Sequence, residues 1–208
     1  MKRSPHKYLL TLALIVALLA CTQTSNTPHQ NNNFTMNTPF TQARAVYYGP
    51  FYEDMGLSTQ VFEMEFFTQG LSLDSMGYLV GTGYHLYITD LFALTSDSIP
   101  PQDTYTVDSI NYGQPQTIMP GKRIGDFLIG AQLTHVGQEF ITSHLLTQGT
   151  LQLQWTNDTA HICINMSTPN KDKVQTYFVG KLPIYYIDYS QDKNPMLSKK
   201  RQGKKHVL

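Results

Sequence analysis

The sequence has little charge, few cysteines and no long apolar run, and each shortage excludes a class of protein. Charged residues make up 14% of the 208 residues, and the formal net charge is zero. The two cysteines cannot by themselves supply the four ligands of a structural zinc site. No apolar run reaches the about 20 residues of a bilayer-spanning helix. A P-loop, a dinucleotide-binding fingerprint and a Gly-x-Ser-x-Gly elbow are absent, so no motif indicates a nucleotide-dependent enzyme or a serine hydrolase.

The N-terminus instead has the zones of a signal peptide. Met1–Lys7 carries three basic residues and no acid, and Tyr8–Ala20 is apolar except for Thr11. The boundary Leu18–Cys21, with the sequence LLAC, resembles a bacterial lipobox. The resemblance implies cleavage after residue 20 and attachment of lipid, palmitate included, to Cys21. The alternatives to a lipobox are an ordinary secretory signal whose cysteine is accidental and an uncleaved membrane anchor.

The residues after Cys21 bear on localisation. Asp at the next position retains similar lipoproteins at the inner membrane, and Thr22 stands there instead. The resemblance therefore implies an outer-membrane lipoprotein of the cell envelope. An acidic cluster that would export it to the cell surface is missing from CTQTSNTPHQ, which favours the periplasmic face.

Composition divides the rest of the chain into three parts. Residues 21–45, rich in Asn, Gln and Thr, are predicted to form a lipidated flexible tether. Residues 46–190 are long enough for one folded domain. Residues 191–208 are predicted to be a basic disordered tail.

The stretch 41–190 holds 14 acidic and 6 basic residues. An acidic domain that leaves the cytoplasm excludes a nucleic-acid partner, whereas the tail could bind anionic lipid or glycan.

The domain has the two-residue period of β-strands almost throughout. In TLQLQW, Leu151, Leu153 and Trp155 alternate with polar residues, and HICINM continues the pattern after a turn. Further strands are predicted at 45–49, 60–67, 84–93, 103–110, 126–134, 139–146 and 174–182, with a turn of helix possible in FYEDMG. About 8–9 strands in an antiparallel meander predict an all-β sandwich or closed barrel. The predicted core contains Leu151, Leu153, Trp155, Ile162, Ile164, Met166 and Phe178.

Four segments together resemble the secreted β-domains of Bacteroidetes lipoproteins: AVYYGPFYEDMG, LYITDLFA, IPPQDTYTVD, and GTLQLQW with KVQTYFVGKL. The chain departs from that pattern at Gln102-Asp103, where Gly is usual. The resemblance implies a fold and a compartment, and it implies no activity.

Candidate chemical groups are sparse. His85, His135, His144 and His161 have no metal-site spacing, so no metal and no cofactor are predicted. Cys163 shares a strand face with His161 and is interpreted as a buried free thiol. Glu63 and Glu65 share another face and could mimic a catalytic carboxylate pair, but a solvent-facing sheet edge explains them more simply.

Aromatic residues are the more prominent feature. Tyr47, Tyr48, Phe51 and Tyr52 open the domain, and Tyr185, Tyr186 and Tyr189 close it. Such residues form sugar-stacking or protein-binding faces, although β-propensity alone also enriches tyrosine in strands. The sequence therefore favours a non-catalytic module that binds a glycan, a lipid or an envelope protein. A periplasmic hydrolase with a dispersed site is the alternative.

Similar envelope proteins receive O-glycans at Asp-Ser or Asp-Thr followed by an aliphatic or similar residue. The resemblance implies candidate sites at Ser75, Ser98, Ser109 and Thr159. Three are predicted to lie in turns, and Ser109 at a strand end is the weakest candidate. The alternative is that these are ordinary turn pairs.

Overall fold

The computed structural model describes residues 34–95, 97–187 and 205–207. The predicted signal peptide 1–20 and Cys21 lie outside the described residues, as do residues 191–204 and 208 of the predicted tail.

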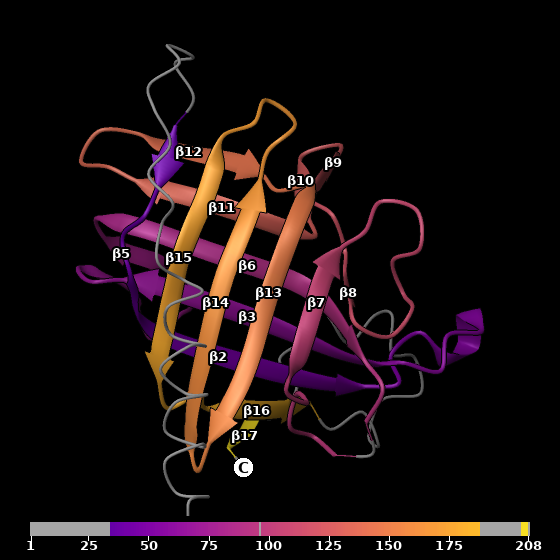
Figure 1. Ribbon diagram of the computed structural model, residues 1–208. Helices are drawn as coiled ribbons and strands as arrows, with labels where there is room; N and C mark the ends of the chain where they lie inside the picture. Colours follow the sequence, from indigo (N-terminus) through magenta and orange to yellow (C-terminus); the bar gives the residue numbers. More distant parts are fainter. Residues whose placement is uncertain (1–33, 96, 188–204, 208) are drawn as a thin grey trace, which may run out of the picture. The chain divides into compact units, whose positions relative to one another are not determined.

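The described part of the chain is built from strands (Figure 1). In chain order they are β1 (Thr35–Met36), β2 (Phe40–Gly49), β3 (Gln60–Thr68), β4 (Leu71–Leu73), β5 (Leu79–Gly81), β6 (Gly83–Ala93), β7 (Asp103–Val107), β8 (Thr117–Ile118), β9 (Lys122–Ile124), β10 (Phe127–Ile129), β11 (Ala131–Val136), β12 (Ile141–Leu145), β13 (Gln148–Thr156), β14 (Thr159–Ser167), β15 (Lys173–Gly180), β16 (Ile184–Ile187) and β17 (Lys205–Val207). One 3-10 helix, η1 (Glu53–Met55), forms the helical turn that FYEDMG predicted.

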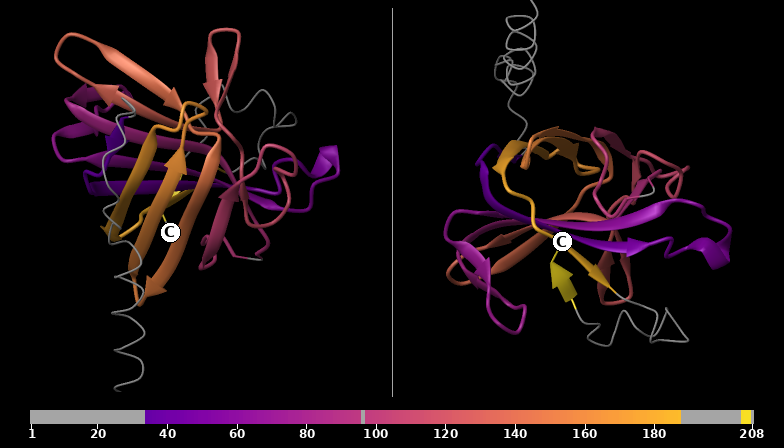
Figure 2. Two further views of the ribbon diagram at one scale, coloured as in Figure 1. Left: turned by 45° about the horizontal axis from the view of Figure 1, so that its top comes forward. Right: turned by 90° about the horizontal axis from the view of Figure 1, so that it is seen from below.

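Eight of these strands close into a barrel in the order β15-β14-β13-β7-β8-β6-β3-β2. Most neighbours are antiparallel, and β13, β14 and β15 form the predicted meander. The β7–β8 and β15–β2 contacts are parallel, which makes the barrel mixed. Strands β13–β15 cross in front of β2, β3 and β6 in Figure 1, and Figure 2 shows the two sets on opposite sides of the barrel. The prediction of an all-β sandwich or barrel is confirmed as a barrel.

The barrel interior is a packed apolar core. An eight-stranded barrel is just wide enough for side chains to fill it, and large inward residues from strands all around the barrel are fully buried. They include Phe62, Phe66, Leu86, Ile88, Tyr105, Ile118, Leu151 and Ile164. The predicted core residues of β13–β15 are confirmed, with one exception. Trp155 is half-buried at the margin of the core, where its indole N–H donates to the Pro100 carbonyl at 3.0 Å.

The predicted limits of the domain are wrong at both ends. Strands β1 and β2 lie inside the predicted tether 21–45, and Phe40 and Ala45 are core residues. This segment alternates only weakly, because Gln42 and Arg44 separate small residues, so its pattern resembles a linker. Strand β17 lies in the predicted tail and pairs with β16.

Gly130 divides the predicted strand 126–134 into β10 and β11. Its φ is +75°, and a Cβ there would meet the Pro120 carbonyl oxygen. Only glycine tolerates this backbone without strain, so Gly130 ends β10, which pairs with β9, before β11 begins.

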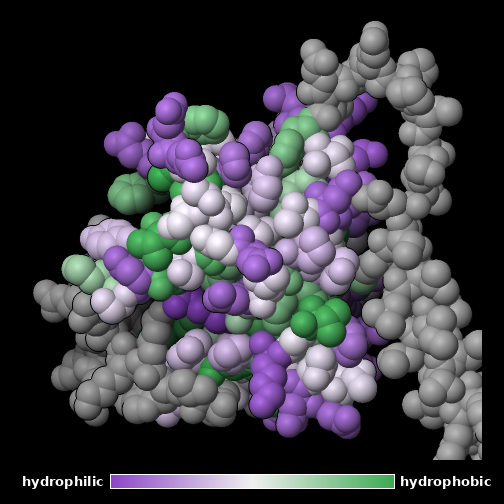
Figure 3. All heavy atoms as spheres, turned by 90° about the vertical axis from the view of Figure 1, so that its left-hand side faces the viewer, coloured by the Kyte–Doolittle hydropathy of each residue, from purple (hydrophilic) through white to green (hydrophobic). Residues whose placement is uncertain are grey.

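Hairpins cover part of the barrel's outer surface. Leu71, Leu73 and Leu79 of the β4–β5 hairpin pack with Phe67 and Val136 in a second, small apolar cluster. Figure 3 views the side of the domain where the β4–β5 and β11–β12 hairpins lie, and polar and apolar side chains are interspersed over it.

Candidate functional site

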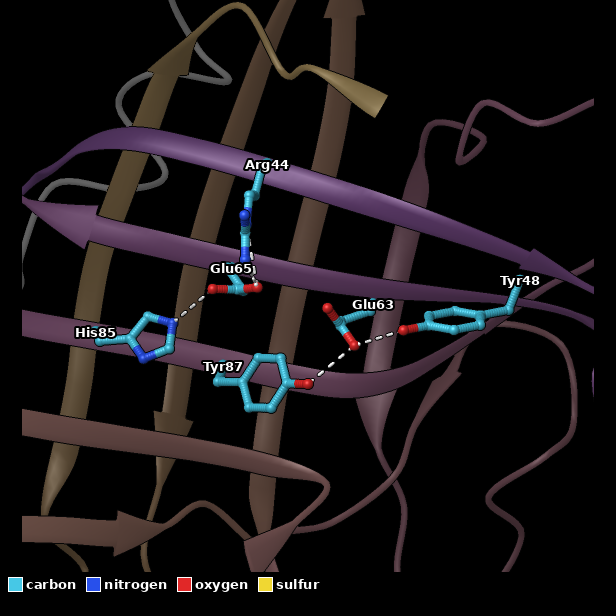
Figure 4. A network of polar contacts seen from close by, with 6 residues as sticks. All are labelled: Arg44, Tyr48, Glu63, Glu65, His85 and Tyr87. Carbon is cyan, nitrogen blue, oxygen red and sulfur yellow. Dashed lines mark hydrogen bonds and ion pairs between the residues drawn. The ribbon is translucent and has the colours of Figure 1, made fainter. Parts of the chain in front are cut away.

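The outer face of β2, β3 and β6 carries a row of polar and aromatic side chains (Figure 4). Side chains alternate along a strand, so Glu63 and Glu65 face outward between the core residues Phe62, Met64 and Phe66. Arg44 on β2 and Tyr87 on β6 are the register partners of Glu65. This register gathers polar groups from three neighbouring strands on one face.

Glu65 is the centre of the first cluster. Arg44 donates to its Oε1 through Nη2 at 2.6 Å and Nε at 3.1 Å, and His85 Nε2 lies 3.2 Å from Oε2. The His85 ring stacks between Phe67 and Tyr87, with centroids at 4.7 and 5.7 Å. Burial tends to raise the pKa of Glu65, but the bonds from His85 and Arg44 outweigh it and lower that pKa. Glu65 is therefore held as a carboxylate.

Glu63 is the centre of the second cluster. The hydroxyls of Tyr48 and Tyr87 both donate to its Oε2, each at 2.9 Å. Burial, and then the charge of Glu63, raise the pKa of Tyr87. Tyr87 is therefore a neutral hydrogen-bond donor at physiological pH.

The sequence interpretation of the two glutamates is partly wrong. They share a face as expected, but β3 lies between β2 and β6 and is not an edge strand. Glu65 is also only 5% exposed. A sequence contains no signal for such burial, because the covering groups come from β2 and β6.

A tyrosine-lined hollow lies next to this face. Strand β16 runs parallel to β2 and places Tyr186 opposite Tyr47, so tyrosines from the two ends of the domain meet. The hollow has a volume of about 420 Å³ and is lined by Tyr47, Tyr48, Gly49, Pro50, Ser98, Tyr186 and Ile187. Its volume lies in the range of small-molecule sites. None of these seven residues is charged.

The tyrosines of the hollow are held in place by neighbours. Tyr47 donates to Gln60 Oε1 at 2.6 Å and packs against Phe62. Burial, together with the charge of Asp97, raises the pKa of Tyr47. The Phe51 ring lies edge-on to Tyr48, with centroids at 6.0 Å. Three of the predicted aromatics do not line the hollow: Phe51 packs against Tyr48, Tyr52 donates to Asp90 at 2.8 Å, and Tyr185 pairs with Val46 of β2. Tyr189 lies outside the described residues.

The other predicted histidines lie away from the hollow. His135 stacks on Tyr84 with centroids at 4.7 Å, and His144 stacks on Phe34 at 5.6 Å. His161 faces outward on β14 beside Cys163, as predicted. Within residues 34–95 and 97–187, no group of three His, Cys, Asp or Glu side chains could hold a metal ion.

The prediction that Cys163 is a buried free thiol is wrong. Cys163 is disulfide-bonded and half-buried on the outer face of β14. The sequence interpretation had assigned the other thiol to lipid and therefore left Cys163 without a partner.

The candidate glycosylation sites differ in accessibility. Ser75 is exposed in the β4–β5 turn, which Asp74 closes by accepting the N–H groups of Met76 and Tyr78. Ser109, the weakest candidate from sequence, is exposed in a bend after β7. Ser98 is half-buried and lines the hollow. Thr159 is not in the turn but is the first residue of β14 and pairs with Thr156.

Pattern reasoning on the sequence missed Arg44 and the grouping of His85 with the glutamates. Arg44 was assigned to the tether, and the only signal for it was its position three residues before Tyr47, where the tyrosine-rich opening begins. Among the described residues, no helix is long and apolar enough to cross a membrane. Comparisons of the chain with protein-family models, with curated proteins and with solved structures find no match.

Proposed function

We propose that this chain is a lipid-anchored protein of the bacterial outer membrane whose barrel is a non-catalytic module that binds a neutral glycan in the tyrosine-lined hollow. The observation that supports this best is the meeting of Tyr47, Tyr48 and Tyr186 around one concave surface. Tyrosine offers a flat apolar ring with a polar tip, which suits the mixed C–H and hydroxyl surface of a sugar.

The uncharged lining supports a neutral ligand. A charged ligand group placed there would lose hydration without gaining an opposite charge, which is costly. An anionic group would in addition be repelled by Asp97, whose charge acts on Tyr47. A pyranose ring on Tyr48 or Tyr186, with a hydroxyl near Ser98, fits these conditions.

Carriage of a lipid inside the barrel is less well supported. Fully buried rings, among them Phe62, Phe66 and Tyr105, occupy the interior. A lipid chain would have to displace close-packed side chains, and such repacking destabilises a core.

A hydrolase is the second candidate because Glu63, Glu65 and His85 gather on one face. Glycoside hydrolysis, however, needs a general acid whose pKa is raised. The pKa of Glu65 is lowered by His85 and Arg44, and Glu63 accepts two phenol hydroxyls. These contacts suit orienting roles better than proton transfer.

The anchoring part of the proposal rests on the sequence alone. A charged start, a short apolar core and LLAC at residues 18–21 together match a lipoprotein signal. Two or three acyl chains would hold the protein stably at a membrane, whereas one would not.

The binding proposal is tested by titrating the full chain with neutral gluco-, manno- and galacto-oligosaccharides in a calorimeter. At least one should bind. Tyr48→Ala and Tyr186→Ala should each weaken its binding by about fivefold to tenfold, the effect of losing one aromatic contact. Tyr78→Ala, in the exposed β4–β5 turn, is the matched control and should bind normally. Absence of binding by the wild type, or equal binding by all variants, would reject the proposed site.

A further inference from the structure

Glu63 is a carboxylate whose hydrogen bonds reach directly to a residue of the hollow. Its Oε2 accepts the hydroxyl of Tyr48, and the Tyr48 ring lines the hollow. A phenol hydroxyl lies at the far end of the side chain, so a bond there, together with the edge-on Phe51 ring, restricts both side-chain torsions of Tyr48.

Glu63 is itself held from the next strand. Tyr87 on β6 donates to the same oxygen at 2.9 Å, so β2, β3 and β6 meet at this carboxylate (Figure 4). Hydrogen bonds to an ionised acceptor are roughly twice as strong as neutral ones.

The neighbouring cluster reduces the electrostatic repulsion between Glu63 and Glu65. Glu65 lies two residues along the same strand face, and two adjacent carboxylates would repel each other. Arg44 offsets that charge through two bonds to Glu65 Oε1. The Arg44–Glu65–His85 cluster therefore supports the Glu63 cluster electrostatically.

We propose that Glu63 is a positioning residue of the hollow, which fixes the Tyr48 ring in its ligand-binding orientation before the ligand arrives. This inference rests on the proposed glycan function. Holding a side chain in its bound conformation removes the entropy cost of ordering it on binding, so Glu63 raises affinity without touching the ligand.

The test compares Glu63→Ala with Glu63→Gln. The alanine variant removes the acceptor, whereas the glutamine amide oxygen can still accept both hydroxyls. Tyr87→Phe removes the other donor and leaves the Tyr48 bond in place. Glu139→Ala, an exposed glutamate after β11, is the matched control. Circular dichroism and melting identify the folded variants.

Two measurements are made on each folded variant. The first is affinity for the oligosaccharide that the wild type binds. We expect the affinity of Glu63→Ala to fall about tenfold, the effect of losing one charge-assisted hydrogen bond. Glu63→Gln and Glu139→Ala should stay within about threefold of the wild type, less than the effect of one neutral hydrogen bond, and Tyr87→Phe, which loosens Glu63 but keeps the Tyr48 bond, should fall between these variants and Glu63→Ala. The second is the nuclear Overhauser effect between the Tyr48 and Phe51 rings in protein labelled with 13C in its aromatic residues, without ligand. It should be lost in Glu63→Ala and kept in Glu63→Gln.

The outcomes separate the two proposals. The positioning role is overturned if folded Glu63→Ala keeps wild-type affinity or keeps the nuclear Overhauser effect between the Tyr48 and Phe51 rings. This holds even if Tyr48→Ala confirms the hollow as the binding site. A wild type that binds no oligosaccharide rejects the glycan function, and the ring measurement then decides by itself whether Glu63 orients Tyr48.

Discussion

Glu65 shows how one residue outside a barrel core can be both charged and buried. Its carboxylate accepts from Arg44 and His85, so the desolvation that disfavours its charge is offset by hydrogen bonds. A buried carboxylate without such partners would instead take up a proton. The same two partners favour the ionised form of Glu65, whereas a catalytic acid must carry a proton.

Glu65→Gln should lower the free energy of unfolding by about 2–3 kcal/mol at pH 7, because bonds to a charged group are the stronger ones. The folded-state pKa of Glu65 lies below its unfolded value. The charge-dependent stabilisation is therefore complete above the ordinary glutamate pKa of about 4.3 and is lost as pH falls through the lowered value.

Urea denaturation of the wild type and Glu65→Gln between pH 7 and pH 2 measures this charge-dependent stabilisation. The difference in free energy of unfolding between the two proteins should narrow below about pH 4. Glu139→Gln, an exposed substitution, should change stability by less than about 0.5 kcal/mol. A difference in free energy of unfolding between wild type and Glu65→Gln that stays constant with pH would show that the Glu65 charge does not stabilise the fold.

At the scale of the element, the barrel depends on a narrow seam between β15 and β2. A single register pair, Phe178 with Phe40, joins these strands in parallel. Phe66 packs against both rings, with centroid distances of 5.6 and 6.2 Å. Closure at this seam is therefore stabilised by side-chain packing more than by a backbone ladder.

Phe178→Ala should cost about 3–5 kcal/mol, as for other buried large aromatics cut to alanine. Tyr177→Ala, the neighbouring residue on the outer face, is 45% exposed and should cost far less. Chemical denaturation of both variants measures the difference. Equal costs would indicate that the seam does not depend on the Phe40, Phe66 and Phe178 rings.

At the scale of the whole molecule, the proposed lipid attachment and the disulfide at Cys163 draw on the same two cysteines. A thiol that carries lipid cannot form a disulfide, and the chain has only two cysteines. Lipid on Cys21 is therefore compatible with the Cys163 disulfide only if that disulfide joins two chains. Intact mass of protein from its native host distinguishes this arrangement from an intramolecular disulfide.

The lipoprotein proposal predicts that the mature protein partitions into detergent, takes up palmitate label and begins at Cys21. Cys21→Ala should abolish both the label and the partitioning. Intact mass spectrometry also records any hexose-sized increments, which we expect at the exposed Ser75 and Ser109 before Thr159. An unlabelled protein in which the two cysteines are joined would reject lipid attachment.

Local pattern was sufficient to predict much of the fold. The two-residue period identified nine strand regions, and all of them contain strands in the structure. It also identified the inward faces of β13 and β14, because the side chains of a half-buried strand alternate between apolar and polar. It could not show whether the sheet closes, since closure depends on the β15–β2 contact between residues 138 positions apart, Phe40 and Phe178.

The sequence by itself determined the all-β class, the meander and the tyrosine-rich ends of the domain. Only the tertiary structure decided that those ends meet in one hollow, that Arg44 belongs to the domain, and that Glu63 and Glu65 have different partners. The physical reason is that alternation along a strand fixes which face a side chain occupies, whereas the pairing of distant strands fixes which side chains share that face.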